Sequence, residues 1–333
     1  MQERRKLCNL VSLQALKVNT AVPKAREPAF RFAPSPNGLL HLGHAYSAIQ
    51  TYEMAKKYAG RLYLRIEDID KARSQECFSA AILRDLHWLG IKWQEPVLYQ
   101  SDNFLLYDSA INDLCELGLL YPCFASRSEI KQALKESKAI QQDPDGAPVY
   151  PALYKDYPKS RAEERIKAGE PFALRLHMDK AIERAKQLKS EIGTDLTYQA
   201  VNKEGKITLA LLQAERWGDV VIKRKDTPTS YHLSVVIDDH NLGITHICRG
   251  KDLEAATDIH RILQINLGLN QPIYYHHDLV LYKDGKLSKS KGHPSLFELR
   301  EKGINPRKIY ESALLGLSHD PSLALTALRK YLP

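Results

Sequence analysis

The chain has 333 residues, of which 44% are hydrophobic and 26% are charged, as is typical of a globular protein with a full core. Its formal net charge of +8 favours a polyanionic partner such as nucleic acid, and because no apolar run approaches the roughly 20 residues of a membrane span, we expect no membrane association. The five cysteines are scattered, without a C-x-C or C-x-x-C pair, which argues against a disulfide framework or a cysteine-rich metal site and favours the reducing cytoplasm.

The N-terminal segment, residues 1–28, is basic and has no apolar stretch of the kind that secretory signals carry. We expect a poorly defined extension. It is interpreted as a frayed tail, a small surface helix or a misassigned start, with a transit-type signal as a less favoured alternative.

Strand and helix patterns alternate over residues 29–118, which we interpret as the first half of a nucleotide-binding fold. Buried strands are expected at 29–32 and 61–66, and helices from Gly43, over 74–89 and over 102–117. Alternation of this kind predicts a doubly wound parallel sheet, with the loops after the two strands meeting at its ligand-binding edge.

The periodicity weakens over residues 119–206, where charged helix candidates at 160–169 and 179–189 predict an inserted subdomain. Sheet patterns return over residues 207–294, the expected second half of the fold. Strands are predicted at 207–212, 217–222, 244–248 and 272–276, and helices around 231–238 and 255–267. Residues 295–333 form a short helical end, with helices expected around 296–300, 309–317 and 323–332.

Two motifs carry the chemistry. The first, R-F-A-P-S-P-N-G-L-L-H-L-G-H at residues 31–44, is a strand, a loop and a helix start, which together offer backbone N–H groups and the positive helix end to an anion. His41 and His44 lie at this helix start, although two histidines three residues apart are also compatible with a polar surface turn. The second motif, K-L-S-K-S at residues 286–290, is by itself compatible with a solvated loop.

Together these motifs resemble the two signatures of class I aminoacyl-tRNA synthetases, in the form that glutamyl-tRNA synthetases carry. L-R-I-E-D-I-D (64–70) and Y-H-L-S-V-V-I-D-D-H (231–240) extend the resemblance over about residues 29–294. It implies a Rossmann-type catalytic domain that forms an aminoacyl-adenylate, with the insertion facing the tRNA. It further implies catalytic roles for His41, His44, Lys286 and Lys289, and ATP binding by His41, Gly43, His44 and Lys289. Magnesium is expected with the phosphates, its ligands unassigned among Asp68, Asp70 and Asp284.

An amino acid substrate with an acidic side chain needs an anion for its ammonium group and cations for its carboxylates. Glu67 can hold the ammonium group, and Arg31 and Arg249 can hold carboxylate oxygens together with the Tyr231 hydroxyl. Glutamate is the substrate that the resemblance implies, bound by Arg31, Phe32, Ala33, Pro34, Ser35, Glu67, Tyr231 and Arg249. The alternatives are a surface ion-pair network for Glu67, a strand-end salt bridge for Arg249, and a water-exposed helix end for Asp238 and Asp239, which otherwise contact adenosine or order neighbouring loops.

Only 43 residues follow Ser290, too few for the helical anticodon-binding domain of a full glutamyl-tRNA synthetase. In this ending, and in its H-L-G-H and V-V-I-D-D stretches, the chain resembles the short glutamyl-queuosine tRNA(Asp) synthetases. That resemblance implies a cytoplasmic ligase, expected to be a monomer, that activates glutamate with ATP without tRNA and transfers it to the queuosine base in the anticodon stem-loop of tRNA(Asp). A truncated synthetase that charges tRNA(Glu) and a noncatalytic tRNA-binding paralogue are the alternatives.

The insertion departs from the family at a zinc site. Many members carry C-x-C followed by Y-x-x-x-C, and the corresponding residues here are Cys123, Ala125, Tyr150 and Tyr154. Because structural zinc requires four suitable ligands, we expect no zinc, with Cys123 and Tyr150 as remnants of the site. Packing of aromatic side chains would then hold the subdomain.

Overall fold

The structure is a computed structural model that describes residues 27–137, 139–189, 195–202, 205–282, 285–286, 294–314 and 327. In its first half, β1 (Ala29–Phe32), α2 (Leu42–Lys57), β2 (Arg61–Ile66) and α3 (Glu76–Trp88) alternate as the sequence predicts. They are followed by β3 (Gln94–Tyr99), a strand that the sequence patterns did not predict. The three strands pair in parallel in the order β1-β2-β3. A 3-10 turn, η1 (Gln100–Asn103), and α4 (Phe104–Glu116) follow. The expected parallel α/β sheet is therefore present.

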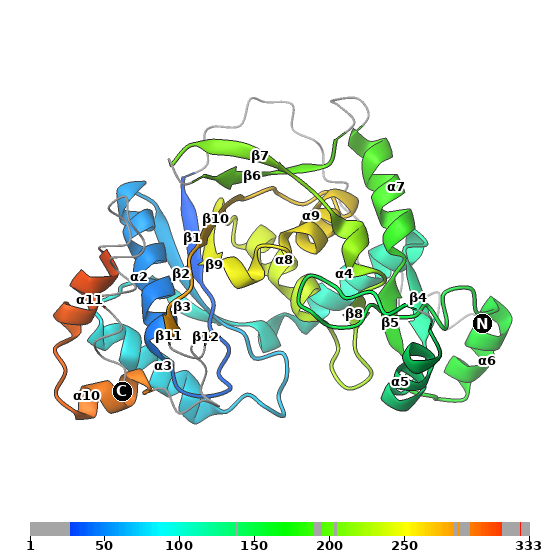
Figure 1. Cartoon of the computed structure of the whole chain (residues 1–333), viewed down its shortest axis with the longest axis horizontal. Helices are drawn as coiled ribbons and strands as arrows, with labels where there is room; N and C mark the ends of the chain where they lie inside the picture. Colours follow the sequence, from blue (N-terminus) through cyan, green and yellow to red (C-terminus); the bar gives the residue numbers. More distant parts are fainter. Residues whose placement is uncertain are drawn as a thin grey trace.

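The insertion contains β4 (Leu120–Cys123), α5 (Arg127–Glu136), α6 (Lys159–Lys167), β5 (Ala173–Leu176) and α7 (Met178–Lys189). Strand β8 (Val221–Lys223) completes an antiparallel sheet of order β4-β5-β8, which lies on the right of the molecule in Figure 1. The bounds predicted for the strand over 217–222 are wrong. Trp217 ends a 3-10 turn, η2 (Ala214–Trp217), and Gly218 takes a positive φ of 59°, so the extended backbone starts only at Val221.

The second half is built from the hairpin β6 (Thr197–Val201) and β7 (Ile207–Leu211), then α8 (Tyr231–Asn241), β9 (His246–Gly250), η3 (Lys251–Leu253), α9 (Thr257–Asn266) and β10 (Ile273–His277). Its sheet has the order β7-β6-β10-β9, with β6, β10 and β9 parallel. Residue Ala29 of β1 joins the two halves, because its backbone N–H donates to Thr245 Oγ1 over 2.8 Å and its carbonyl accepts from the Thr245 N–H over 2.9 Å.

The described C-terminal residues return to the first half. After the short strands β11 (Leu281–Tyr282) and β12 (Gly285–Lys286) come α10 (Leu296–Glu301) and α11 (Pro306–Leu314). Gln50 Nε2 of α2 donates to the carbonyl of Ala313 over 2.8 Å, so α11 is fastened to α2, as Figure 1 shows on the left. Apart from residue 327, the third expected helix lies outside the described residues, as do residues 1–26.

Two hydrophobic clusters support the functional edge of the sheet. One packs α2, α3, α10 and α11 around β1 and β2, and the other packs α4, α7, α8 and α9 together. In the described part of the chain, no helix has the length and apolar character needed to cross a bilayer. The domain bounds expected from the sequence stay a prediction.

Candidate active site

The N-terminus of α2 is capped by two imidazole rings. His41 Nδ1 accepts the backbone N–H of Gly43 over 3.1 Å, and His44 Nδ1 accepts the backbone N–H of His41 over 3.1 Å. Both Nδ1 atoms are acceptors, so each neutral ring carries its proton on Nε2. The two rings lie 3.9 Å apart between centroids. The helix start therefore places two imidazole rings beside the positive end of the helix dipole, an environment that suits a phosphate group.

Gly43 leaves room for the His41 ring in this cap. A Cβ atom at position 43 would lie 3.0 Å from Cε1 and 3.1 Å from Nδ1 of the His41 ring. Any side chain here would press against the ring that accepts the Gly43 N–H. The glycine of the H-L-G-H motif thus makes room for the first histidine.

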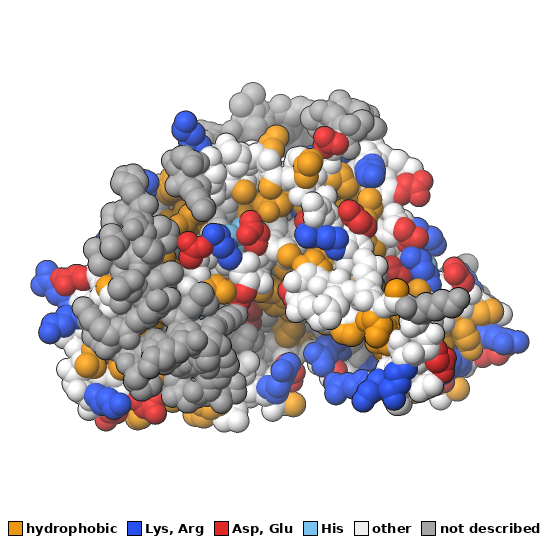
Figure 2. Space-filling view, in the orientation of Figure 1, with side chains coloured by type: hydrophobic (Ala, Val, Ile, Leu, Met, Phe, Trp, Pro, Cys, Tyr) orange, Lys and Arg blue, Asp and Glu red, His pale blue; other side chains and the backbone are white. Residues whose placement is uncertain are grey.

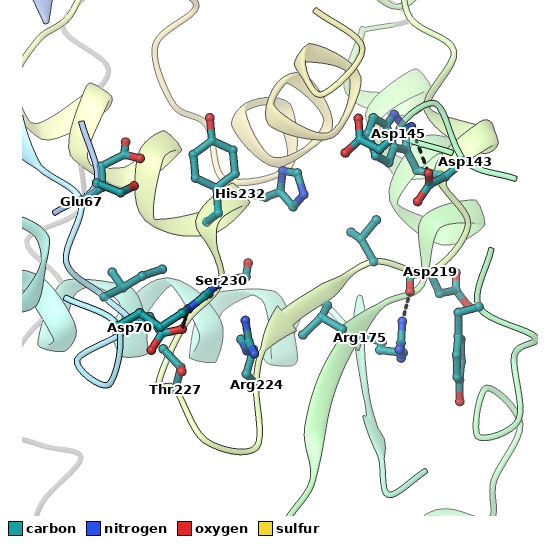
Figure 3. A pocket seen from close by; sticks show the side chains of 18 of the residues that line it. Glu67, Asp70, Asp143, Asp145, Arg175, Asp219, Arg224, Thr227, Ser230 and His232 are labelled. Atoms are coloured by element: carbon teal, nitrogen blue, oxygen red, sulfur yellow. Dashed lines mark hydrogen bonds and ion pairs between the residues drawn. The ribbon is translucent and has the colours of Figure 1, made fainter. Parts of the chain in front are cut away.

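A cleft of about 500 Å³ lies between the sheet edge and the insertion. Of the predicted glutamate ligands, Ser35, Glu67 and Tyr231 line it. Figure 3 shows Glu67 on one side, with Asp143, Asp145, Arg175 and Asp219 of the insertion side facing it across the cavity, and His232 between them. His41 and His44 are not part of this lining.

Behind the cleft wall, Asp239 of α8 binds two arginines. Arg31 Nε donates to Asp239 Oδ1 over 3.0 Å, and Arg65 Nη1 donates to the same oxygen over 2.6 Å. The other terminal nitrogen of Arg65 donates to Glu67 Oε1 over 3.1 Å. The arginine and aspartate side chains are buried, so this Arg31–Asp239–Arg65–Glu67 network fixes Arg31 and Glu67 relative to each other.

The pKa values of the two carboxyl groups in this network are shifted in opposite directions. Burial alone would raise the pKa of Asp239, but the charges and hydrogen bonds of Arg31 and Arg65 outweigh it and hold the pKa below its usual value. For Glu67 burial outweighs the same arginines, and its pKa is raised. Asp239 is thus the permanent anion of the network. Glu67 is an anion that a cationic ligand, such as a substrate ammonium group, would stabilise.

Asp238, the preceding residue of α8, points to the first half of the fold. It accepts hydrogen bonds from Gln100 Nε2 over 2.8 Å, from Asn103 Nδ2 over 3.0 Å and from the Tyr107 hydroxyl over 2.9 Å. Only 1% of Asp238 and 4% of Asp239 is exposed. The water-exposed interpretation of this pair is therefore wrong, and both residues order their neighbours.

Arg249 lies at the end of β9, 5% exposed. Its guanidinium group donates to Thr257 Oγ1 over 2.7 Å, contacts His260 Nδ1 at 3.2 Å and donates to His276 Nε2 over 3.3 Å. None of the ion pairs between described residues includes Arg249. Among these residues Arg249 therefore does not form the strand-end salt bridge that was the alternative interpretation. Burial raises the pKa of Tyr231, and the positive charge of Arg249 offsets part of this rise.

The remaining predicted residues are distributed around this centre. Phe32 is buried at the end of β1, Ala33 follows it, and the carbonyl of Pro34 accepts the Glu67 N–H over 3.0 Å, which joins the two loops. Lys286 lies in β12, while Lys289 lies outside the described residues. Arg65 was not predicted as a site residue, although it lies in the L-R-I-E-D-I-D stretch directly before Glu67.

The proposed magnesium ligands are engaged elsewhere. Asp68 accepts the Ser101 N–H over 2.8 Å and the Ser101 hydroxyl over 2.7 Å, and Asp70 pairs with Arg73 over 2.7 Å. Asp284 lies outside the described residues. The carboxylates of Asp68 and Asp70 thus already have partners, so the described contacts do not assign either of them as a magnesium ligand.

The corresponding residues of the insertion do not fit a zinc ion. Cys123 Sγ lies 3.2 Å from the Tyr150 hydroxyl, Ala125 has no ligand atom, and the Tyr154 hydroxyl accepts from Arg165 over 3.2 Å. Within the described residues, no group of three or more His, Cys, Asp or Glu side chains is arranged to hold a metal. Instead, Arg165 stacks on Phe124, 4.1 Å from the ring centroid.

The sheet edge, the capped helix and the charged cleft define a class I synthetase catalytic domain. The model of the family described as tRNA synthetases class I (E and Q), catalytic domain, matches residues 29–322, and the chain belongs to this family. The glutamyl-Q tRNA(Asp) synthetase of Rhodobacter capsulatus is 43% identical over 289 residues, which cover 86% of this chain and 99% of that protein. The resemblance expected from the signatures is confirmed.

Other relatives are longer. The glutamate–tRNA ligase of Coprothermobacter proteolyticus is 35% identical over 294 residues, which cover 87% of this chain and 59% of the ligase. Among solved structures, the glutamate-tRNA synthetase of Elizabethkingia anophelis has a TM-score of 0.68 and 23% identity, over 86% of this chain and 61% of that one. This likeness confirms the expected fold class. The chain thus spans nearly all of one relative and about three fifths of the others.

Proposed function

We propose that this protein activates glutamate with ATP, in the absence of tRNA, and transfers the glutamyl group to the queuosine base in the anticodon of tRNA(Asp). The observation that supports this acceptor is the extent of the match: 99% of the glutamyl-Q tRNA(Asp) synthetase from Rhodobacter capsulatus, but 59% of the glutamate–tRNA ligase from Coprothermobacter proteolyticus.

The charges around the cleft support glutamate as the substrate. Glu67 lines the cleft, where a substrate ammonium group would stabilise its ionised form. Arg31 has one nitrogen on Asp239, and none of the hydrogen bonds found between described residues uses its two terminal nitrogens, so these remain available for a carboxylate. An arginine fork binds both carboxylate oxygens at once. One anion and separate cations suit an amino acid with a second carboxylate.

In the first step a glutamate carboxylate oxygen attacks the α-phosphorus of ATP, and pyrophosphate leaves with the electrons of the broken P–O bond. The negative charge that develops at phosphorus requires donors that are already oriented. His41 and His44 would supply their Nε2–H groups from the helix start. Lys289, the second lysine of the downstream signature, is proposed to stabilise the leaving pyrophosphate, with Lys286 beside it. Magnesium would neutralise part of the phosphate charge.

In the second step a hydroxyl group of the queuosine cyclopentene ring attacks the activated carbonyl carbon. An ester bond forms, AMP leaves with the electrons of its bond to the acyl carbon, and the hydroxyl proton is released. The basic surface would guide the RNA. Figure 2 shows Lys and Arg side chains gathered at the lower edge of this face, close to α5 and to the loop after β8. Helix α5 contributes the exposed Arg127, Lys131 and Lys135, so binding should weaken as salt rises.

The decisive experiment compares acceptors. The protein is incubated with ATP, labelled glutamate and either tRNA(Asp) that contains queuosine, the same RNA with unmodified guanosine, or tRNA(Glu). We expect glutamylation of the queuosine RNA alone, and we expect it to survive removal of the 3′-terminal adenosine. Charging that required the 3′ end would instead identify a truncated synthetase for tRNA(Glu). Binding of tRNA without glutamate-dependent ATP–pyrophosphate exchange would identify a noncatalytic paralogue.

A further inference from the structure

Two histidines, His260 and His232, form a chain that runs from Arg249 to the cleft, and a third, His276, contacts Arg249 on its other side. His260 of α9 contacts Arg249 through Nδ1, at 3.2 Å, and contacts His232 Nδ1 through Nε2, also at 3.2 Å. His232 is the second residue of α8 and lines the cleft, where Figure 3 shows its ring between the fold and the insertion. His276 accepts from Arg249 on its other side, through Nε2 at 3.3 Å.

The tautomers of this chain follow from Arg249. A guanidinium group has only donors, so His260 Nδ1 must accept and the proton of the neutral His260 ring must lie on Nε2. That N–H points to His232 Nδ1, which must accept in turn. The proton of the neutral His232 ring therefore also lies on Nε2. No hydrogen bond between described residues uses this atom, and it is not among their buried unpartnered polar atoms.

The surroundings keep all three rings neutral. Burial and the charge of Arg249 lower the pKa of His232 to about 4 and that of His276 to about 2. The pKa of His260 is lowered well below its usual value by burial, Arg249 and His232. Oε1 of Glu254 lies 4.0 Å from Nδ1 of His276. The His276 ring therefore separates the Glu254 carboxylate from Arg249, which contacts Nε2 on the other side of the ring. Arg249 is thus held by neutral groups and keeps its charge for a ligand.

We propose that His232 donates its Nε2–H to a carboxylate oxygen of the amino-acid substrate. His260 is a positioning residue, because its contacts with Arg249 and with His232 fix the tautomer of the His232 ring. This inference rests on the proposed glutamate activation and adds a substrate contact to it. The Tyr231 ring, 5.7 Å from His260 between centroids, lies beside the chain and completes this wall. The substrate carboxylate would then meet an N–H donor backed by the charge of Arg249.

The test uses glutamate-dependent ATP–pyrophosphate exchange in the whole chain. His232→Leu and His260→Leu should each raise the KM for glutamate roughly 10- to 100-fold, the range expected when a buried donor or acceptor loses its partner, and leave the KM for ATP within about twofold. The double variant should be no worse than the more damaged single variant, because both changes remove one donor. His260→Gln, which retains an acceptor and a donor, should restore most of the affinity.

His177→Leu is the matched control, because His177 is also buried, with a pKa lowered by burial, but lies in the insertion away from Arg249. It should leave the KM for glutamate within about twofold. Multiplicative effects of the two leucine variants, or a His260→Gln variant no better than His260→Leu, would overturn the inference.

A second measurement needs no leucine variant. Nitrogen-15 NMR of histidine-labelled wild-type protein should show neutral Nε2–H tautomers for His232 and His260 from pH 6 to 8. The signals are assigned with the His260→Gln variant and with a His232→Gln variant. Glutamate should shift the His232 Nε2 signal. An Nδ1–H tautomer or a protonated ring at His232 would refute the inference even if exchange activity is normal. Absent exchange activity with the expected tautomers would instead refute the proposed function.

Discussion

Asp239 joins two buried guanidinium groups, and Asp239→Asn removes the charge that both of them require. The bonds to Arg31 and Arg65 measure 3.0 and 2.6 Å, and the three side chains are 7% exposed or less. Removing one partner of a buried ion pair costs about 3–5 kcal/mol. The two pairs share one oxygen, so the effects do not add, and we expect about 3–5 kcal/mol in total. At roughly 2–4 °C per kcal/mol, Tm should fall by about 6–20 °C.

Thermal melting at pH 7 measures this effect, with Glu311→Gln as the matched control. Glu311 also pairs with an arginine, Arg307, over 3.1 Å, but the two side chains are 61% and 83% exposed, so its loss should change stability by less than about 0.5 kcal/mol. A Tm for Asp239→Asn within about 2 °C of wild type would refute the reasoning. The KM for glutamate should also rise, because Arg31 loses its fixed orientation.

The pH dependence of the same variant checks the sign. The pKa of Asp239 is lowered on folding, so its contribution is complete above the unfolded pKa of about 3.9 and is lost as the pH falls through the lowered native value. The stability difference between wild type and Asp239→Asn should therefore be constant from pH 6 to 8 and shrink below about pH 4. A difference that grew on acidification would contradict the assignment.

The pKa of Glu67 is raised by burial, so the KM for glutamate should rise as the pH falls through that raised value, and Glu67→Gln should abolish this dependence; a wild-type KM that improved on acidification would exclude Glu67 as the ammonium ligand. Arg249→Ala should lower kcat/KM for glutamate activation by about 30- to several-thousand-fold, as expected for roughly 2–5 kcal/mol, while ATP binding survives. A loss of only a few-fold would remove Arg249 from the site. Elemental analysis of protein purified without chelator should find no stoichiometric zinc, since Ala125 and Tyr154 replace two ligands; one zinc per chain would show that other residues bind it.

Elements with regular apolar spacing could be predicted from the sequence, and mixed ones could not. The strand β2 alternates Leu62, Leu64 and Ile66 with polar positions and was predicted at its observed bounds. In contrast, Tyr198 is the only buried residue of β6, whose other residues are half-buried, so that strand has no apolar period to find. Strand β8 has three residues and depends on pairing with β5, a contact between residues far apart in the sequence.

The site shows the same division. Glu67, Ser35 and Tyr231 line the cleft, and each lies within one of the motifs quoted from the sequence, so the resemblance could place them in the site. Arg65 could not be assigned, since an arginine in a strand is usually a solvated residue, and its partner Asp239 is 174 positions away. His260 belongs to no motif. Its role emerges only where α8 and α9 pack together.

The consecutive aspartates of α8 have a mechanical consequence. Asp238 accepts hydrogen bonds from η1 and α4, while Asp239 accepts hydrogen bonds from β1 and β2. One turn of a helix from the second half is therefore bonded to two separate parts of the first half. Sliding of one half against the other would break both sets of buried bonds together. The two halves should therefore move as a single block, which would keep the glutamate-binding residues of the cleft and the helix start at His41 at a constant spacing.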